Sequence, residues 1–386
     1  MMIKQMRATL SVLACLMTAS CAMMPSSEDT APAIAKTAPE TAPLPDRTLD
    51  MFTPGPDQAC YDRTTMPSTM VVDTHNHFRP FGGAAIPFEE TISYLERTGV
   101  LFANVYGIGQ SLPFSSGCEY YLDCVGTPAI PSMQNDLANA ANLIDYEPET
   151  VILTLSMTFP DLARPWQIPD QIARLDRTYE GLFRWMGEVN LVKQALMGNG
   201  HVATPIEVIQ DWAPFMAILR ERNVPLAIHS DLGSDEAPYT YVGLMKEVLR
   251  LYPDNTIIWM HMGLSRELTT MPAEDHIALM KDFLDTNPNL YLDISWRVVP
   301  DAYFDTPEKR AAYVAFLNAY PGRILTGTDF VASHVKTFDV YEEEVAVNSA
   351  ILADLDDEAF RQIALGETYF RMLDLPYRAP DICKAP

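Results

Sequence analysis

The sequence predicts an α/β protein built as a parallel (β/α)8 barrel, and three observations lead to this fold class. Short apolar runs alternate with amphipathic stretches from about Met70 onward. We count eight such alternations, which is typical of this barrel. No Gly-x-Gly-x-x-Gly motif follows the first run. Its absence argues against the alternative, a doubly wound open sheet with a dinucleotide site.

Each expected strand is a short apolar run, as in buried parallel strands, and each expected helix has an amphipathic pattern. The strands are expected at 69–74, 101–106, 151–156, 184–189, 224–228, 256–260, 290–294 and 323–328. The helices are expected at 88–98, 134–144, 170–181, 206–222, 241–251, 275–285, 307–319, 339–352 and 357–365. An irregular insertion, 110–132, interrupts the pattern after the second strand.

The first 21 residues have the pattern of a signal peptide. Lys4 and Arg7 give a positive start, and an apolar run too short to span a bilayer follows. Cys21 comes directly after small residues, which resembles the lipobox of bacterial lipoproteins. Thr18 occupies the position where leucine is usual, so plain secretion remains the alternative. We therefore expect export, as a periplasmic or outer-membrane lipoprotein of a bacterium.

Residues 22–66 are rich in proline, alanine and threonine, a composition typical of a semi-rigid tether. The barrel domain is then expected at 67–386. The net charge of −24 disfavours nucleic acid and anionic membrane surfaces as partners. The expected partner is a small-molecule substrate, with membrane contact only through the lipid anchor. The sequence does not predict the oligomeric state.

Four cysteines follow Cys21, and an even number in an oxidising compartment favours disulfides. They permit three pairings, and the sequence alone does not choose among them. Our hypothesis pairs Cys118 with Cys124, which closes a short local loop. It pairs Cys60 with Cys383, because barrel closure tends to bring the segments flanking the first strand and the last helix together.

Histidines and carboxylates stand at the ends of several expected strands, and active sites of such barrels lie at the carboxyl ends of strands. The first strand ends in His-x-His, whose alternating side chains point the same way. The remaining histidines, His201, His276 and His334, lie in loops or in a helix. The six potential ligands at strand ends are His75, His77, Glu188, His229, His261 and Asp329.

These motifs resemble those of the amidohydrolase superfamily over about residues 70–375. Val-Val-Asp-Thr-His-Asn-His at 71–77 is similar to its first-strand motif. Pro-Leu-Ala-Ile-His at 225–229, His-Met-Gly at 261–263 and Leu-Thr-Gly-Thr-Asp-Phe at 325–330 resemble its motifs of strands five, six and eight. The branch with the greatest resemblance is the amidohydrolase-related one, which includes aminocarboxymuconate-semialdehyde decarboxylase.

The resemblance implies one divalent ion, zinc or alternatively manganese, held by His75, His77, His229 and Asp329, with His261 as an acid/base group. Asp329 would accept a proton from the attacking water. Glu188 resembles a carboxylate that bridges two ions in other branches, so a second ion is the alternative. The implied function is hydrolysis of a small-molecule amide, lactone or ester bond. Non-oxidative decarboxylation and a non-catalytic binding lipoprotein are the alternatives.

Three arginines follow expected strands and are candidates for binding a carboxylate of the substrate. Arg79, Arg266 and Arg297 come after the first, sixth and seventh strands. A guanidinium group binds a carboxylate through two parallel hydrogen bonds, which makes arginine suitable for this task.

Overall fold

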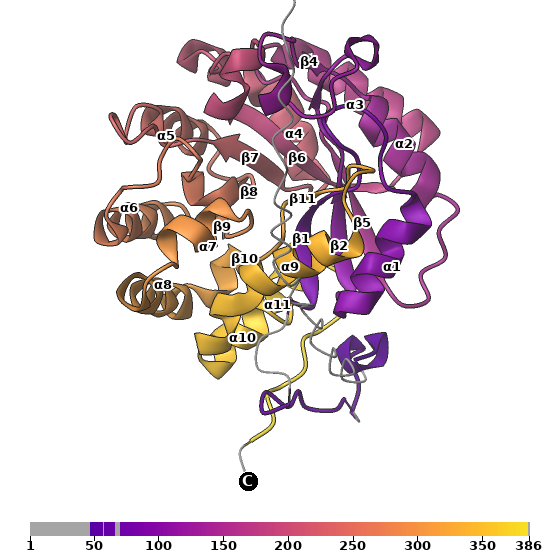
Figure 1. Cartoon of the computed structure of the whole chain (residues 1–386), viewed down its shortest axis with the longest axis vertical. Coiled ribbons are helices and arrows are strands. Elements are labelled where there is room, and N and C mark those ends of the chain that lie inside the picture. The colour runs from indigo at the N-terminus through magenta and orange to yellow at the C-terminus, as the bar shows by residue number, and fades with distance from the viewer. Residues whose placement is uncertain (1–46, 57, 66–69, 385–386) are drawn as a thin grey trace, which may run out of the picture. The chain divides into compact units, whose positions relative to one another are not determined.

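The computed structural model describes residues 47–56, 58–65 and 70–384, which form a parallel barrel surrounded by helices (Figure 1). The strand order is β10-β9-β8-β7-β6-β5-β2-β1-β11. The two outermost members, β10 (Ile324–Leu325) and β11 (Phe330–Val331), are parts of one interrupted strand. The backbone N–H of Thr74 donates to the Thr326 carbonyl over 3.0 Å. The first and last strands therefore join, and the predicted (β/α)8 fold is confirmed.

The strands agree with the predicted ones to within a few residues, except the last. The other barrel strands are β1 (Val72–His77), β2 (Phe102–Tyr106), β5 (Ile152–Met157), β6 (Phe183–Val192), β7 (Leu226–Ser230), β8 (Ile257–Trp259) and β9 (Leu290–Asp293). The predicted strand 323–328 is wrong beyond residue 325, because the chain leaves the ladder between β10 and β11. Asp329 lies in this gap with a φ of 55°.

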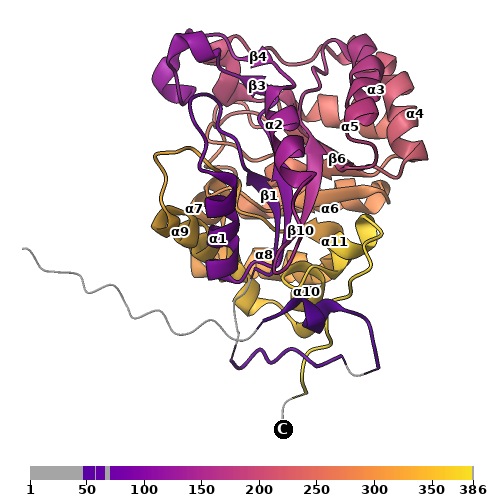
Figure 2. The ribbon, with the colours of Figure 1, turned by 90° about the vertical axis from the view of Figure 1, so that its right-hand side faces the viewer.

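Helices pack around the outside of the strands in both views (Figures 1 and 2). They are α1 (Phe88–Thr98), α2 (Gln134–Leu143), α3 (Ile168–Thr178), α4 (Ala213–Glu221), α5 (Val242–Leu251), α6 (Ala273–Thr286), α7 (Val298–Tyr303), α8 (Pro307–Ala319), α9 (Phe338–Ser349), α10 (Asp357–Ile363) and α11 (Glu367–Met372). The predicted helix 206–222 is α-helical only in its second half. Its first half is a 3-10 helix, Ile206–Trp212, and Pro214 then stands in the first turn of α4.

The segment before the barrel is packed where it is described. A 3-10 helix, Leu49–Phe52, precedes Tyr61, and the side chains of Phe52 and Tyr61 are fully buried in the core. Cys60 forms a disulfide with Cys383, as predicted. The predicted tether is therefore too long at its carboxyl end, because Phe52 and Tyr61 supply apolar surface to the core. Residues 1–46, which hold the predicted signal peptide and most of the tether, lie outside the described residues. Among the described helices, none combines the length and the apolar character needed to cross a membrane.

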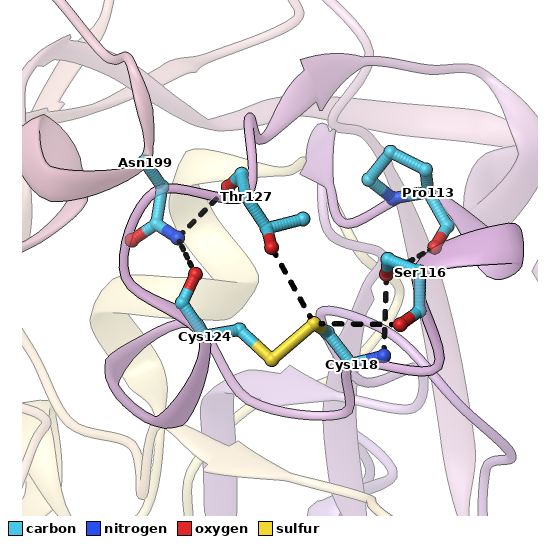
Figure 3. The surroundings of a disulfide bond; sticks show 6 residues. All are labelled: Pro113, Ser116, Cys118, Cys124, Thr127 and Asn199. Carbon is cyan, nitrogen blue, oxygen red and sulfur yellow. Dashed lines mark hydrogen bonds between the residues drawn. A yellow bond between two sulfur atoms is a disulfide. The ribbon is translucent and has the colours of Figure 1, made fainter. Parts of the chain in front are cut away.

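The insertion after β2 is an ordered unit beside the carboxyl ends of the strands. It contains an antiparallel pair of two-residue strands, β3 (Gln110–Ser111) and β4 (Ile130–Pro131). The predicted disulfide between Cys118 and Cys124 is confirmed. Asn199, the last residue of a 3-10 helix after β6, donates to the carbonyl oxygens of Cys124 and Thr127 over 2.9 Å each (Figure 3). These bonds attach the insertion to the β6 loop.

Candidate metal centre

The candidate site lies at the carboxyl ends of the barrel strands. His75 and His77 stand two residues apart at the end of β1, so their side chains lie on the same side of the strand. The backbone N–H of Asp329 donates to the His75 carbonyl over 2.8 Å. The positive φ of Asp329 is costly for a residue other than glycine. The strained turn brings the Asp329 carboxylate beside the two imidazoles.

Three side-chain atoms, His75 Nε2, His77 Nε2 and Asp329 Oδ1, form a tight triangle. The two nitrogens are 3.0 Å apart, and Asp329 Oδ1 lies 3.3 Å from His75 Nε2 and 3.2 Å from His77 Nε2. Ligand atoms bound to one tetrahedral ion at about 2.0–2.2 Å are roughly 3.3–3.6 Å apart. The spacing of this triangle is close to that of ligands sharing one ion.

Hydrogen bonds on the far side of each ring determine which nitrogens face the triangle without a proton. His77 Nδ1 donates to the carbonyl oxygen of Gly107 over 2.5 Å. The Ser295 hydroxyl donates to Asp293, so its oxygen accepts from His75 Nδ1 at 2.9 Å. In the neutral imidazole only one nitrogen carries a proton. In the neutral form that a metal ligand requires, both rings therefore present Nε2 as an acceptor.

This donor set fits a divalent ion. Three acceptor atoms packed this closely repel one another unless a cation or a proton lies between them. Imidazole nitrogen and carboxylate oxygen are ligands for both zinc and manganese. His75, His77 and Asp329 are the residues that would hold such an ion, and the outer hydrogen bonds would fix their orientation.

Glu188, within β6, connects this triangle to a second group of side chains. One carboxylate oxygen contacts His229 Nδ1 and lies 3.4 Å from His261 Nε2. The other oxygen is 3.8 Å from His77 Nε2. His261 Nδ1 donates to the Ser295 carbonyl over 3.1 Å, and within the described part of the chain Nε2 has no hydrogen-bond partner. Glu188, His229 and His261 are therefore a second candidate ligand group.

Lys193 lies against the same carboxylate. Its Nζ is 3.3 and 3.2 Å from the two oxygens of Glu188, and the residues are each only 7% exposed. The Lys193 backbone N–H donates to His201 Nε2 over 3.0 Å. The structure therefore has a buried ion pair inside the candidate centre.

The charges at the site shift the pKa values of its members strongly. Burial alone would lower the pKa of His75, but the carboxylates of Asp329 and Asp293 outweigh burial and raise it to about 9. Burial would raise the pKa of Glu188, but the charges of Lys193 and the neighbouring histidines lower it well below its usual range. The carboxylates are thus held ionised, and the site attracts positive charge.

Sequence analysis missed the carboxylates that orient the histidines. Asp293 Oδ2 lies 3.6 Å from His75 Nδ1 and 3.4 Å from His261 Nδ1. Asp231 Oδ1 lies 2.9 Å from His229 Nε2. Asp293 is the last residue of β9, and Asp231 directly follows β7. The rule of strand ends, applied to every carboxylate, would have found both.

A cavity of about 430 Å³ adjoins the triangle. His77, Asp329 and Lys193 form part of its wall. The insertion supplies another part through Glu119 and Asp123. Aromatic side chains at the wall are Phe81, Tyr120, Tyr121 and Trp296. A small molecule in this cavity would therefore contact both the candidate centre and apolar surfaces.

The three arginines predicted to bind substrate have different surroundings. Arg266 lines the cavity and lies 5.7 Å from the centre of the Trp296 ring. Arg297 also lines it, but pairs with Asp301 and with two glutamates of α9. Arg79 is absent from the cavity wall, and its Nε donates weakly to an asparagine of α2 over 3.4 Å. Only Arg266 thus combines access to the cavity with a guanidinium group that forms no ion pair within the described residues.

Comparisons with known proteins agree with this fold. A family model described as "Amidohydrolase" matches residues 155–366, more than half of the chain. A solved amidohydrolase from Burkholderia multivorans with bound zinc is 14% identical, with coverage of 80% of this chain and 100% of that chain and a TM-score of 0.53. A dihydroorotase from Saccharomyces cerevisiae in complex with 5-fluoroorotic acid is 13% identical, with coverage of 80% and 84% and a TM-score of 0.49. No curated protein matches. At this identity, the first structure supports the fold alone.

Proposed function

The chain belongs to the amidohydrolase family and is a metal-dependent hydrolase that uses a divalent ion; we propose that it cleaves an amide, lactone or ester bond of a small anionic molecule. The observation that carries this proposal is the triangle of His75, His77 and Asp329 beside a cavity of about 430 Å³. Cavities of this size take ligands of low molecular mass.

The residues around the triangle suit hydrolysis. A bound divalent ion supplies Lewis-acid chemistry, because it acidifies a water molecule and polarises the bond to be cut. Asp329 is held ionised by its histidine neighbours, so its carboxylate can accept the proton of the attacking water. His261 Nε2 is buried and has no hydrogen-bond partner among the described residues, so it is free to hold a proton near the leaving group.

Two cations in the cavity wall support an anionic substrate, although carboxylates also line this cavity. Arg266 and Lys336 both line the cavity, and neither forms an ion pair within the described part of the chain. Lys336 Nζ lies 4.8 Å from the centre of the Phe330 ring. In a chain with a net charge of −24, two cations that form no close ion pair among the described residues are available for a ligand. The aromatic residues would contact the apolar part of the same molecule.

The proposal is tested by assaying panels of lactones, esters and amides with and without a carboxylate, using metal-loaded and chelator-treated protein. Turnover should need the metal, return on adding zinc or manganese, and favour the carboxylate-bearing compounds. Arg266→Ala should raise KM about fivefold with little change in kcat, since one exposed charge contact is worth roughly 1 kcal/mol. Arg220→Ala, exposed on α4, is the control. Loaded protein that hydrolyses none of the three classes, or that instead releases carbon dioxide, would contradict the proposal.

We also propose that the protein is exported and anchored by a lipid on Cys21. The support comes from the sequence of residues 1–21 and from the two disulfides, which are typical of oxidising compartments. Cys21→Ser should shift the protein from the detergent phase to the aqueous phase. Unchanged partitioning would contradict lipid anchoring.

A further inference from the structure

The buried pair of Glu188 and Lys193 bears on how many ions the centre holds. Glu188 can act as a ligand in two sets of side chains, because one oxygen faces His77, a member of the triangle, and the other faces His229 and His261. A carboxylate in this position could bridge two ions. Lys193 Nζ already lies within hydrogen-bond distance of both of its oxygens.

A second ion would have to share Glu188 with the ammonium group of Lys193. The two side chains are only 8% and 5% exposed, so their charges are poorly screened by water. Two divalent ions and an ammonium group would then surround one carboxylate. Mutual repulsion of the three cations would strongly disfavour this arrangement, whereas one ion and the ammonium group leave Glu188 shared between two cations.

Both ring nitrogens of His229 already contact carboxylates. Its Nδ1 contacts Glu188, and its Nε2 lies 2.9 Å from Asp231 Oδ1. A second ion at Glu188, His229 and His261 would have to displace one of these carboxylates from the ring. The only buried ring nitrogen left without a hydrogen-bond partner in this group, among the described residues, is His261 Nε2.

We propose that the ammonium group of Lys193 takes the place of a second metal ion, so that the centre holds one ion at His75, His77 and Asp329. This inference rests on the metal centre of the proposed function and adds the number of ions. Lys193 acts as a positioning residue, because it holds the Glu188 carboxylate beside the histidines without serving as a metal ligand.

Metal content tests this inference without an activity assay. The purified full-length protein is saturated with Mn²⁺, freed of excess metal, and analysed for manganese per chain. Its paramagnetic resonance spectrum is recorded as well. The parent should contain about one Mn²⁺ per chain and show an uncoupled spectrum. Two ions per chain with a coupled spectrum in the parent would overturn the inference, whatever the variants do.

Two substitutions at one position separate charge from packing. Lys193→Met removes the ammonium group but keeps a long side chain, so it should bind about two ions with a coupled spectrum. Lys193→Arg retains the charge and should remain at one ion. Circular dichroism and thermal melting check that each variant is folded. A folded Lys193→Met protein that saturates at one ion would also overturn the proposal.

The outcomes distinguish this inference from the proposed function. One ion in the parent without turnover of any substrate class would retain the ion count and contradict the hydrolase proposal. Turnover by a parent with two ions would contradict the ion count and support the hydrolase proposal. No bound Mn²⁺ and no bound Zn²⁺ in a folded parent would contradict both.

Discussion

Two groups of buried histidines in this barrel differ in what surrounds them. His75 and His261, at the carboxyl ends of strands, share the Asp293 carboxylate and face Asp329 and Glu188. His276, in α6, is equally buried but lies between Tyr313 and a backbone carbonyl. The first group faces several negative charges, whereas His276 has neutral partners.

The contrast appears in the direction of the pKa shifts. The carboxylates raise the pKa of His75 to about 9, although burial opposes this, whereas burial lowers the pKa of His276 to about 4. His201 behaves like His276, and its pKa is lowered to about 4, chiefly by burial. Burial of a histidine therefore does not by itself indicate a site. The candidate ligands face carboxylates that require a cation, whereas the other buried histidines serve packing.

The largest expected effect is the loss of turnover in Asp329→Asn. Asparagine keeps the shape of the side chain but cannot accept the proton of the attacking water. Loss of a general base lowers kcat by about 10²- to 10⁴-fold, equivalent to roughly 3–5 kcal/mol of barrier. The measurement is kcat/KM together with the metal content of the same sample.

Asp275→Asn is the matched control, because Asp275 is exposed on α6 and should leave kcat unchanged. If metal-loaded Asp329→Asn kept activity within a few-fold of the parent, another residue would have to accept the proton.

The strand ends could be predicted from sequence because the barrel closes in only one way. Placing His75 at the end of the first strand and Asp329 at the end of the eighth was enough to bring them together. The interruption between β10 and β11 could not be predicted from the sequence, because it depends on backbone hydrogen bonds to a strand far away in sequence. The pairing of Lys193 with Glu188 was missed for a similar reason. It depends on the path of the loop after β6, which carries no periodic pattern.

Metal removal should distinguish the candidate ligand His75 from the histidines that serve packing. An ion bound only by the folded protein stabilises it by about 3–4 kcal/mol when present at roughly 100 to 1,000 times its Kd. A chelator should therefore lower the melting temperature of the parent but not that of His75→Ala, which cannot hold the ion tightly. Differential scanning calorimetry of both proteins checks this. An equal response of the two would mean that His75 is not a ligand.

His276→Asn should affect stability without affecting the site. His276 donates from Nε2 to the Met262 carbonyl over 3.0 Å and accepts from the Tyr313 hydroxyl over 2.8 Å. Asparagine cannot satisfy both partners, and an unpaired buried polar group costs about 1–3 kcal/mol. The side chain of His276 is fully buried, so water cannot take the place of either partner. Urea unfolding should show the loss, while kcat and metal content stay at the parental values.

The smallest expected effect is a change with pH in the stability difference between the parent and His276→Asn. Because the pKa of His276 in the folded protein, about 4, lies below its usual value of about 6.5, an acidified solution protonates the unfolded chain first. The stability that neutral His276 provides is therefore present above pH 6.5 and is lost as the pH falls toward 4. Between pH 7.5 and 5.5 the parent should lose about 1.4 kcal/mol that His276→Asn does not lose. Urea unfolding of both proteins at the two pH values should show the gap between them narrowing by that amount. A gap that stayed constant would mean that His276 is not held neutral, and the distinction between the two groups of histidines would no longer hold.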